Sequence, residues 1–285
     1  MPARRRKKRK KQKATQHLRT GDTFVDAFKL HDAITSYERA SKIDTKSAEA
    51  HLKLADTYSA AEMPRKAYRA YKQALQIHPK NAECHFALAE FLMGIHKPRL
   101  AIPAYGRAIE CDADRHYYHC RLGEAHRRVG ERDDARASLE TAIRLAPGDA
   151  YYHYRLADAF FRWKDWEAAV EEYRLAIDCA PFDDFYYISL CAAHLRLRKV
   201  EDALNAIRRT VILRPKNRSY IFLLAWLLEQ AEYERDAQEY YARAGRLGPY
   251  EEDYVRRVLA KSGVDGTEAD DDWWEHQEST RRPTS

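Results

Sequence analysis

Small and apolar residues recur along the chain with a period of 34 positions. The clearest row is formed by seven alanines: Ala33, Ala67, Ala101, Ala135, Ala169, Ala203 and Ala237. A second small row follows seven residues later, from Ala40 to Ala244, and a large residue lies between the two rows, as at Tyr37 or Leu139. A third small row precedes the first by twelve residues. This pattern predicts two amphipathic helices in each unit, with small residues where the helices approach closely.

The period divides the chain into seven consecutive units. Their boundaries are 14–47, 48–81, 82–115, 116–149, 150–183, 184–217 and 218–251. Prolines punctuate them: five end second helices, and Pro64 and Pro98 begin second helices, where the missing N–H costs little. Pro103 lies inside a predicted second helix, so we expect a kink or a late start there.

This spacing resembles the tetratricopeptide repeat, whose signature W-x2-L-G-x2-Y, A-x3-F and P recurs every 34 residues. The resemblance covers residues 14–251. It implies an all-α fold, a right-handed superhelix of helix pairs, whose first helices line a concave peptide-binding groove. One departure is systematic. Where the family most often has tryptophan, the units carry His17, His51, His85, His119, His153, Tyr187 and Ile221.

Three further segments flank the repeats. Residues 1–13 form a basic arm, either disordered or helical. Residues 252–263 mimic half a repeat and predict a capping helix, with Val255 and Val258 packed and Lys261 facing water. Residues 264–285 predict an acidic disordered tail.

Composition places the protein outside the membrane and disordered classes. Hydrophobic residues are 45% and charged residues 33%, with a mean hydropathy of −0.73. The five cysteines are odd in number and form no CxxC pair. They therefore favour reduced thiols and a cytoplasmic location. A nuclear location is also compatible if the organism is eukaryotic.

No motif indicates catalysis, a cofactor or a metal. A Gly-rich phosphate loop, GxSxG and HExxH are all absent from the sequence. The histidine row does not predict a zinc site, because equivalent positions in adjacent repeats lie about 8–10 Å apart, whereas zinc ligands lie about 2 Å from the ion. We predict a protein that is not an enzyme and holds neither cofactor nor metal.

The family resemblance assigns the groove to particular positions of each unit. Those positions are rich in Tyr, Trp and Arg, which are enriched in binding hot spots. The predicted groove residues are Tyr117, Arg121, Glu124, Arg128, Tyr151, Tyr154, Arg155, Asp158, Phe161, Arg162, Phe185, Ile188, Phe222 and Trp226. A local alternative stays open: Arg121–Glu124 and Arg155–Asp158 also have the spacing of (i, i+3) ion pairs, which contribute little and need no partner.

Paired aromatics recur at one position of three successive units. We expect the first of each pair (Tyr117, Tyr151, Phe185) to face the groove, and the second (Tyr118, Tyr152, Tyr186) to pack between repeats.

The two tails carry opposite charge. Nine cations lie in ten residues of the arm: Arg4, Arg5, Arg6, Lys7, Lys8, Arg9, Lys10, Lys11 and Lys13. Such a run suits phosphates of RNA or DNA, or an anionic membrane surface, and is also found in plain solubility tails. The acidic tail contains Trp273 and Trp274 and resembles tryptophan-acidic cargo peptides of kinesin light chain repeats. We hypothesise that it docks into a groove, so that deleting residues 264–285 raises affinity for the partner.

The sequence therefore predicts an adaptor that binds a peptide or helix of a protein partner in its groove. Two alternatives remain: a nucleic-acid- or ribosome-associated factor bound through the arm, and a structural subunit of a fixed assembly.

Overall fold

The computed structural model describes residues 2–246, 248 and 251–263. Fifteen α-helices, and no strands, lie within these residues, which confirms the all-α fold. In chain order they are α1 (Pro2–Asp26), α2 (Leu30–Ile43), α3 (Ala48–Ala60), α4 (Pro64–Ile77), α5 (Ala82–Gly94), α6 (Pro98–Cys111), α7 (His116–Val129), α8 (Arg132–Leu145), α9 (Ala150–Arg162), α10 (Trp166–Cys179), α11 (Asp184–Arg196), α12 (Val200–Leu213), α13 (Arg218–Gln230), α14 (Glu234–Arg246) and α15 (Glu252–Ser262).

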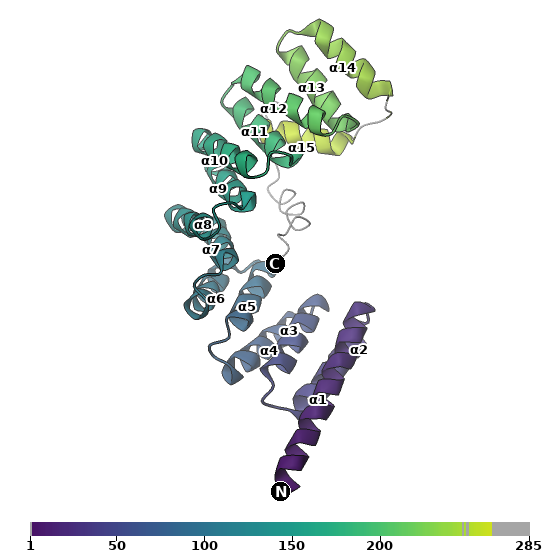
Figure 1. The fold of residues 1–285 in the computed structure, drawn as a ribbon, viewed down its shortest axis with the longest axis vertical. Helices are drawn as coiled ribbons and strands as arrows, with labels where there is room; N and C mark the ends of the chain where they lie inside the picture. Colours follow the sequence, from purple (N-terminus) through teal and green to yellow (C-terminus); the bar gives the residue numbers. More distant parts are fainter. Residues whose placement is uncertain (1, 247, 249–250, 264–285) are drawn as a thin grey trace. The chain divides into compact units, whose positions relative to one another are not determined.

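The chain divides into two compact units, Met1–Leu145 with α1–α8 and Ala146–Ser285 with α9–α15. In each, consecutive helices pack as pairs, for example α1 on α2 and α9 on α10 (Figure 1). The periodic alanines lie at these contacts: Ala33, Ala67, Ala101, Ala135, Ala169 and Ala203 are fully buried. A small side chain at this position brings the two helix axes close together.

Gly123 shows how tight the contact is. A Cβ atom on Gly123 would lie 2.8 Å from Leu139 Cγ and 3.0 Å from the carbonyl oxygen of Ala135. Glycine is therefore required sterically where α7 meets α8.

The turn between the two helices of each repeat uses the left-handed backbone region. Phe28, Glu62, His96, Lys164, Arg198 and Glu232 have φ between 55° and 66°, and Gly130 has φ of 85°. These residues lie at one position of every repeat, and only the fourth repeat places a glycine there. The next residue donates its N–H to a carbonyl five residues back, as Met63 does to Tyr58 at 2.8 Å. These hydrogen bonds satisfy carbonyls that the helix end leaves open.

Two prolines begin second helices, and a third lies inside one. Pro64 and Pro98 are the first residues of α4 and α6. Helix α6 runs from Pro98 through Pro103 to Cys111, so it does not start late. The alternative expectation, a kink at Pro103, stays a prediction. Pro103 has no backbone N–H, so one hydrogen bond is missing from the interior of α6.

Candidate functional site

Ion pairs between successive first helices cross one face of the first compact unit. Lys53 Nζ lies 2.7 Å from Asp22 Oδ1, and Arg121 Nε lies 2.7 Å from Glu90 Oε1. Arg121 Nη2 also donates to Glu90 Oε2 at 3.1 Å. In each pair the residues are 31 positions apart, so the cation comes from the following repeat. The local pairing of Arg121 with Glu124 is therefore wrong.

The carboxylates at this position of the first three repeats, Asp22, Asp56 and Glu90, accept hydrogen bonds from tyrosines of their own repeat. The donors are Tyr37 to Asp22 at 2.7 Å, Tyr71 to Asp56 at 2.6 Å, and Tyr105 to Glu90. Burial raises the pKa of Asp22, but the hydrogen bonds from Lys53 and Tyr37 outweigh it and hold that pKa below its ordinary value. These acids fix neighbouring helices to one another.

The fourth repeat replaces that tyrosine with Leu139, and its acid is held differently. Glu124 is 3% exposed. It accepts hydrogen bonds from Arg127 Nη2 at 2.6 Å and from Arg128 Nε at 3.1 Å. Two cations thus compensate the buried charge of this predicted groove residue.

The second compact unit presents a face formed by its first helices α9, α11 and α13, which we call the first-helix face. Helix α15 folds back onto this face and packs against α11 and α13 (Figure 1). Its buried stripe contains Val255 and Val258, which are 4% and 3% exposed. At its N-terminal end, the ring of Tyr254 lies 6.0 Å from that of Tyr220, and the Glu251 N–H donates to Ser219 Oγ at 3.4 Å.

Lys261 on α15 is buried at 3% exposure, so the expectation that it faces water is wrong. Its Nζ lies 3.7 Å from Asp158 Oδ1 on α9. It also lies 5.0 Å from the ring centre of Phe161 and 5.9 Å from that of Tyr173. Asp158 Oδ2 accepts a hydrogen bond from Arg162 Nε at 2.8 Å. A carboxylate and two aromatic rings thus surround the buried ammonium group.

The C-terminal end of α15 is held by Arg196 of α11. Arg196 Nε donates to the carbonyl of Lys261 at 2.8 Å, and its Nη2 to that of Ala260 at 3.3 Å. A guanidinium at a helix C-terminus satisfies open carbonyls and opposes the negative end of the helix dipole. Gly263 follows with φ of 71°, and a Cβ there would lie 2.2 Å from Arg196 Nη1. Any other residue here would make the Arg196 guanidinium shift and would add the strain of a positive φ.

The paired aromatics divide unevenly between the face and the core. The second members Tyr118, Tyr152 and Tyr186 are 6%, 0% and 9% exposed. Of the first members, Tyr117 and Tyr151 are half-buried, and Phe185 is 6% exposed.

The other predicted groove residues are also largely covered. Tyr154 and Ile188 are each 1% exposed, Arg155 is 6% and Phe161 is 8%. Arg162, Phe222 and Trp226 are half-buried. The structure thus brings Asp158, Phe161 and Arg162 together around Lys261, a residue that periodicity alone assigned to solvent.

The histidines that replace tryptophan bind the chain around them. His85 Nε2 lies 2.8 Å from the Pro79 carbonyl, and His119 Nε2 lies 2.9 Å from the Ala113 carbonyl, six residues earlier in both cases. Tyr187 donates to the Pro181 carbonyl across the same spacing. In these three repeats the side chain fastens the first helix to the turn before it.

One cluster of potential metal ligands occurs in the part of the chain that the structure describes. His126, Glu131 and Asp134 bring ligand atoms within 4.8 Å of one another at the turn between α7 and α8. His126 Nδ1 and Glu131 Oε2 are already hydrogen-bonded at 2.6 Å. Structural zinc sites use four ligands, so the hydrogen bond accounts for this arrangement better than an ion does.

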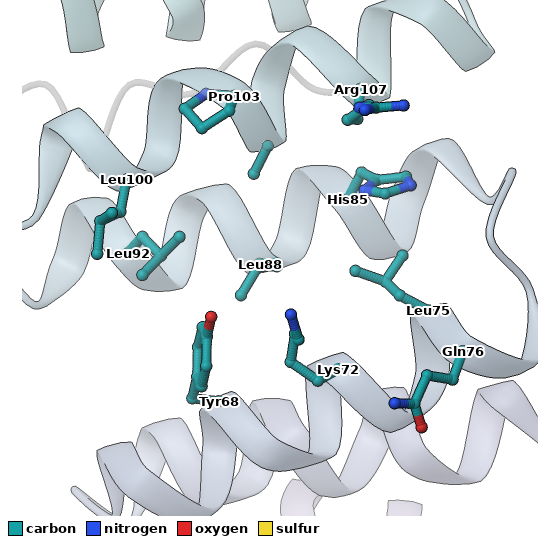
Figure 2. A pocket seen from close by; sticks show the side chains of 11 residues that line it. Tyr68, Lys72, Leu75, Gln76, His85, Leu88, Leu92, Leu100, Pro103 and Arg107 are labelled. Atoms are coloured by element: carbon teal, nitrogen blue, oxygen red, sulfur yellow. The ribbon is translucent and has the colours of Figure 1, made fainter.

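A separate apolar pocket of about 510 Å³ opens in the first compact unit between α4, α5 and α6 (Figure 2). Leu75, Leu88, Leu92, Leu100 and Pro103 contribute its apolar lining, and Lys72 and Arg107 are among its polar residues. The sequence patterns did not indicate it, because the pocket joins residues of three helices.

Comparison with known families decides the class of the protein. Profiles described as "Tetratricopeptide repeat" match residues 59–122, 120–184 and 192–252, and one described as "TPR repeat" matches 21–61. The chain belongs to the tetratricopeptide repeat (TPR) family. A search of curated protein sequences finds no match.

Solved structures with the same fold are TPR proteins. The C-terminal part of a TPR repeat-containing protein from Cytophaga hutchinsonii is 15% identical, with a TM-score of 0.69 over 84% of this chain and 98% of that chain. MamA is 24% identical, with a TM-score of 0.54 over 59% and 91%. YrrB, titled "a TPR protein with an unusual peptide-binding site", is 23% identical, with a TM-score of 0.50 over 58% and 85%.

The two tails of this TPR chain carry the remaining predicted sites. The arm lies within α1, where the side chains from Lys8 to Lys13 are exposed. Trp273 and Trp274 lie outside the described residues. None of the described helices is long and apolar enough to cross a membrane.

Proposed function

We propose that this TPR protein is a non-enzymatic adaptor that binds a helical segment of a protein partner on the first-helix face of its second compact unit. The observation that carries the proposal is the position of α15. An eleven-residue helix rests on α11 and α13, with apolar anchors and polar contacts at both ends. A face that accommodates one amphipathic helix has the shape and chemistry to accommodate another.

The known repertoire of the fold supports this assignment. TPR repeats are protein-interaction modules, and the YrrB structure is titled as that of a peptide-binding TPR protein. The partner helix must displace α15, which has the advantage of being tethered to the face. A short tether gives an effective concentration in the millimolar range, so α15 weakens partner binding without blocking it.

The arm is proposed to supply a second, less selective attachment. Its exposed lysines extend from a helix whose other end packs in the first repeat. They favour an anionic surface, whichever polyanion provides it.

The test uses the full chain with α15 released. Val255→Asp and Val258→Asp together place two charges in buried positions of α15 and leave the face itself unchanged. The matched control is Asp253→Ala with Arg256→Ala, whose side chains are 77% and 70% exposed on the same helix. The probe is a fluorescein-labelled peptide of residues 251–263, and binding is measured by fluorescence polarisation.

We expect the released chain to bind the peptide at least tenfold more tightly than the wild-type and control chains. Circular dichroism establishes that all three chains are folded. Should the released chain lose its fold, a chain with a protease site between Arg246 and Glu251 replaces it. Cutting that chain frees α15 after folding, and the labelled peptide must then exchange for it. A folded, released chain that does not bind the peptide refutes the proposal.

A further inference from the structure

Lysine is among the residues least often fully buried, because its ammonium group loses hydration that must be replaced. Lys261 is nevertheless 3% exposed, and it lies at the C-terminal end of the helix that covers the first-helix face. A helix that merely capped the apolar surface would gain nothing from a charge there. The burial of this lysine therefore indicates a feature of the face that favours a cation.

That feature is a cage of side chains that all come from helices earlier in the sequence than α15. Asp158 and Phe161 lie on α9, and Tyr173 lies on α10. Asp158 is itself 3% exposed, and Arg162 orients it through Oδ2, while Oδ1 is the oxygen that lies 3.7 Å from the lysine. The two ring faces add the attraction between an aromatic quadrupole and a cation.

Two further contacts fix where the cage lies along a bound helix. Val255 and Val258 occupy the apolar part of the face, at six and three residues before the lysine. Arg196 caps the carbonyls at the end of the helix. Two places after the lysine glycine is favoured, because φ is positive there and a Cβ would displace the Arg196 guanidinium. The order of contacts reads Val-x-x-Val-x-x-Lys-Ser-Gly in α15.

We propose that Asp158, Phe161 and Tyr173 form a lysine-binding site, and that the partner of this face is a helix that carries a lysine at its C-terminal end. Two apolar anchors lie three and six residues before this lysine, and a glycine follows the helix. The inference rests on the proposed function and adds the chemistry of the ligand. Helix α15 is then a copy of the partner motif carried by the protein itself. An acidic segment does not fit this cage, because a carboxylate would face Asp158.

The experiment adds two peptides and one variant to the released chain described above. One peptide is residues 251–263 unchanged, and the second carries Lys261→Met, which keeps the length of the side chain and removes its charge. We expect the methionine peptide to bind at least tenfold more weakly. The variant is the released chain with Asp158→Asn, in which the difference between the two peptides should fall below threefold.

A difference of less than threefold in the released chain overturns the lysine site while leaving the proposed function intact, because both peptides still bind. Failure of both peptides on a folded chain refutes the proposed function instead. A preference for lysine that persists unchanged with Asp158→Asn also overturns the assignment of the cage. Phe28→Ala, on a side chain that is 92% exposed in the other compact unit, serves as the control for substitution as such.

Discussion

The pairing of Arg121 with Glu90 across two repeats gives a prediction whose size follows from the structure. The pair is bidentate, and its side chains are only 19% and 23% exposed. At about 4 Å and an effective dielectric constant of about 20, two unit charges attract by about 4 kcal/mol. Loss of hydration and of side-chain freedom offsets roughly half of this, so we expect a coupling free energy of about 2 kcal/mol.

A reference pair in the same compact unit sets the scale. Arg136 Nε and Glu140 Oε1 are 2.6 Å apart, but their side chains are 58% and 49% exposed. Solvent screens such a pair, and its expected coupling is about 0.3–0.5 kcal/mol. Equal distances with unequal burial therefore predict a difference of about fourfold or more.

The assay is a pair of double-mutant cycles. Glu90→Gln and Arg121→Gln are combined in one cycle, and Arg136→Gln and Glu140→Gln in the other. Urea unfolding is followed by circular dichroism for each chain. Because a repeat array can unfold in more than one step, hydrogen exchange of the amides in α5–α7 checks that the loss is local. A coupling for the buried pair no larger than that of the exposed pair would refute the reasoning.

Three further outcomes are expected. Glu62→Gly should raise the free energy of unfolding by about 1 kcal/mol, because glycine relieves the strain of the positive φ. Gly130→Ala should lower the free energy of unfolding by a similar amount, and chemical denaturation measures both changes. Burial lowers the pKa of His194 below its ordinary 6.5. The stability that the neutral side chain contributes is therefore present above pH 6.5 and is lost as the pH falls toward the folded-state pKa. His194→Gln should flatten the fall in melting temperature between pH 7 and pH 5. Replacing Lys8, Lys10, Lys11 and Lys13 with Gln should lower the salt needed to elute the chain from heparin, and an unchanged elution would argue against the arm as a polyanion site.

Much of the fold was predictable because each repeat packs mainly against its neighbours in sequence. The alanine rows specify where helices touch, and each helix pair contacts mainly its neighbours in sequence, so spacing alone predicts the pairs. The second aromatics Tyr118, Tyr152 and Tyr186 were expected to pack, and they are buried. The left-handed turns were not predicted, because only one of the seven residues with positive φ at these turns, Gly130, is a glycine.

The sequence by itself determined the family, the helix pairs and the positions where they approach. Tertiary structure decided how the charged side chains are used. Arg121 could have paired along its own helix with Glu124, and the packing of α5 beside α7 gave it Glu90 instead. It also decided the place of α15, whose amphipathic pattern says which residues are buried but not against which surface. Periodicity describes a helix and its nearest neighbours, whereas the position of Lys261 beside Asp158 depends on a contact between residues about a hundred positions apart.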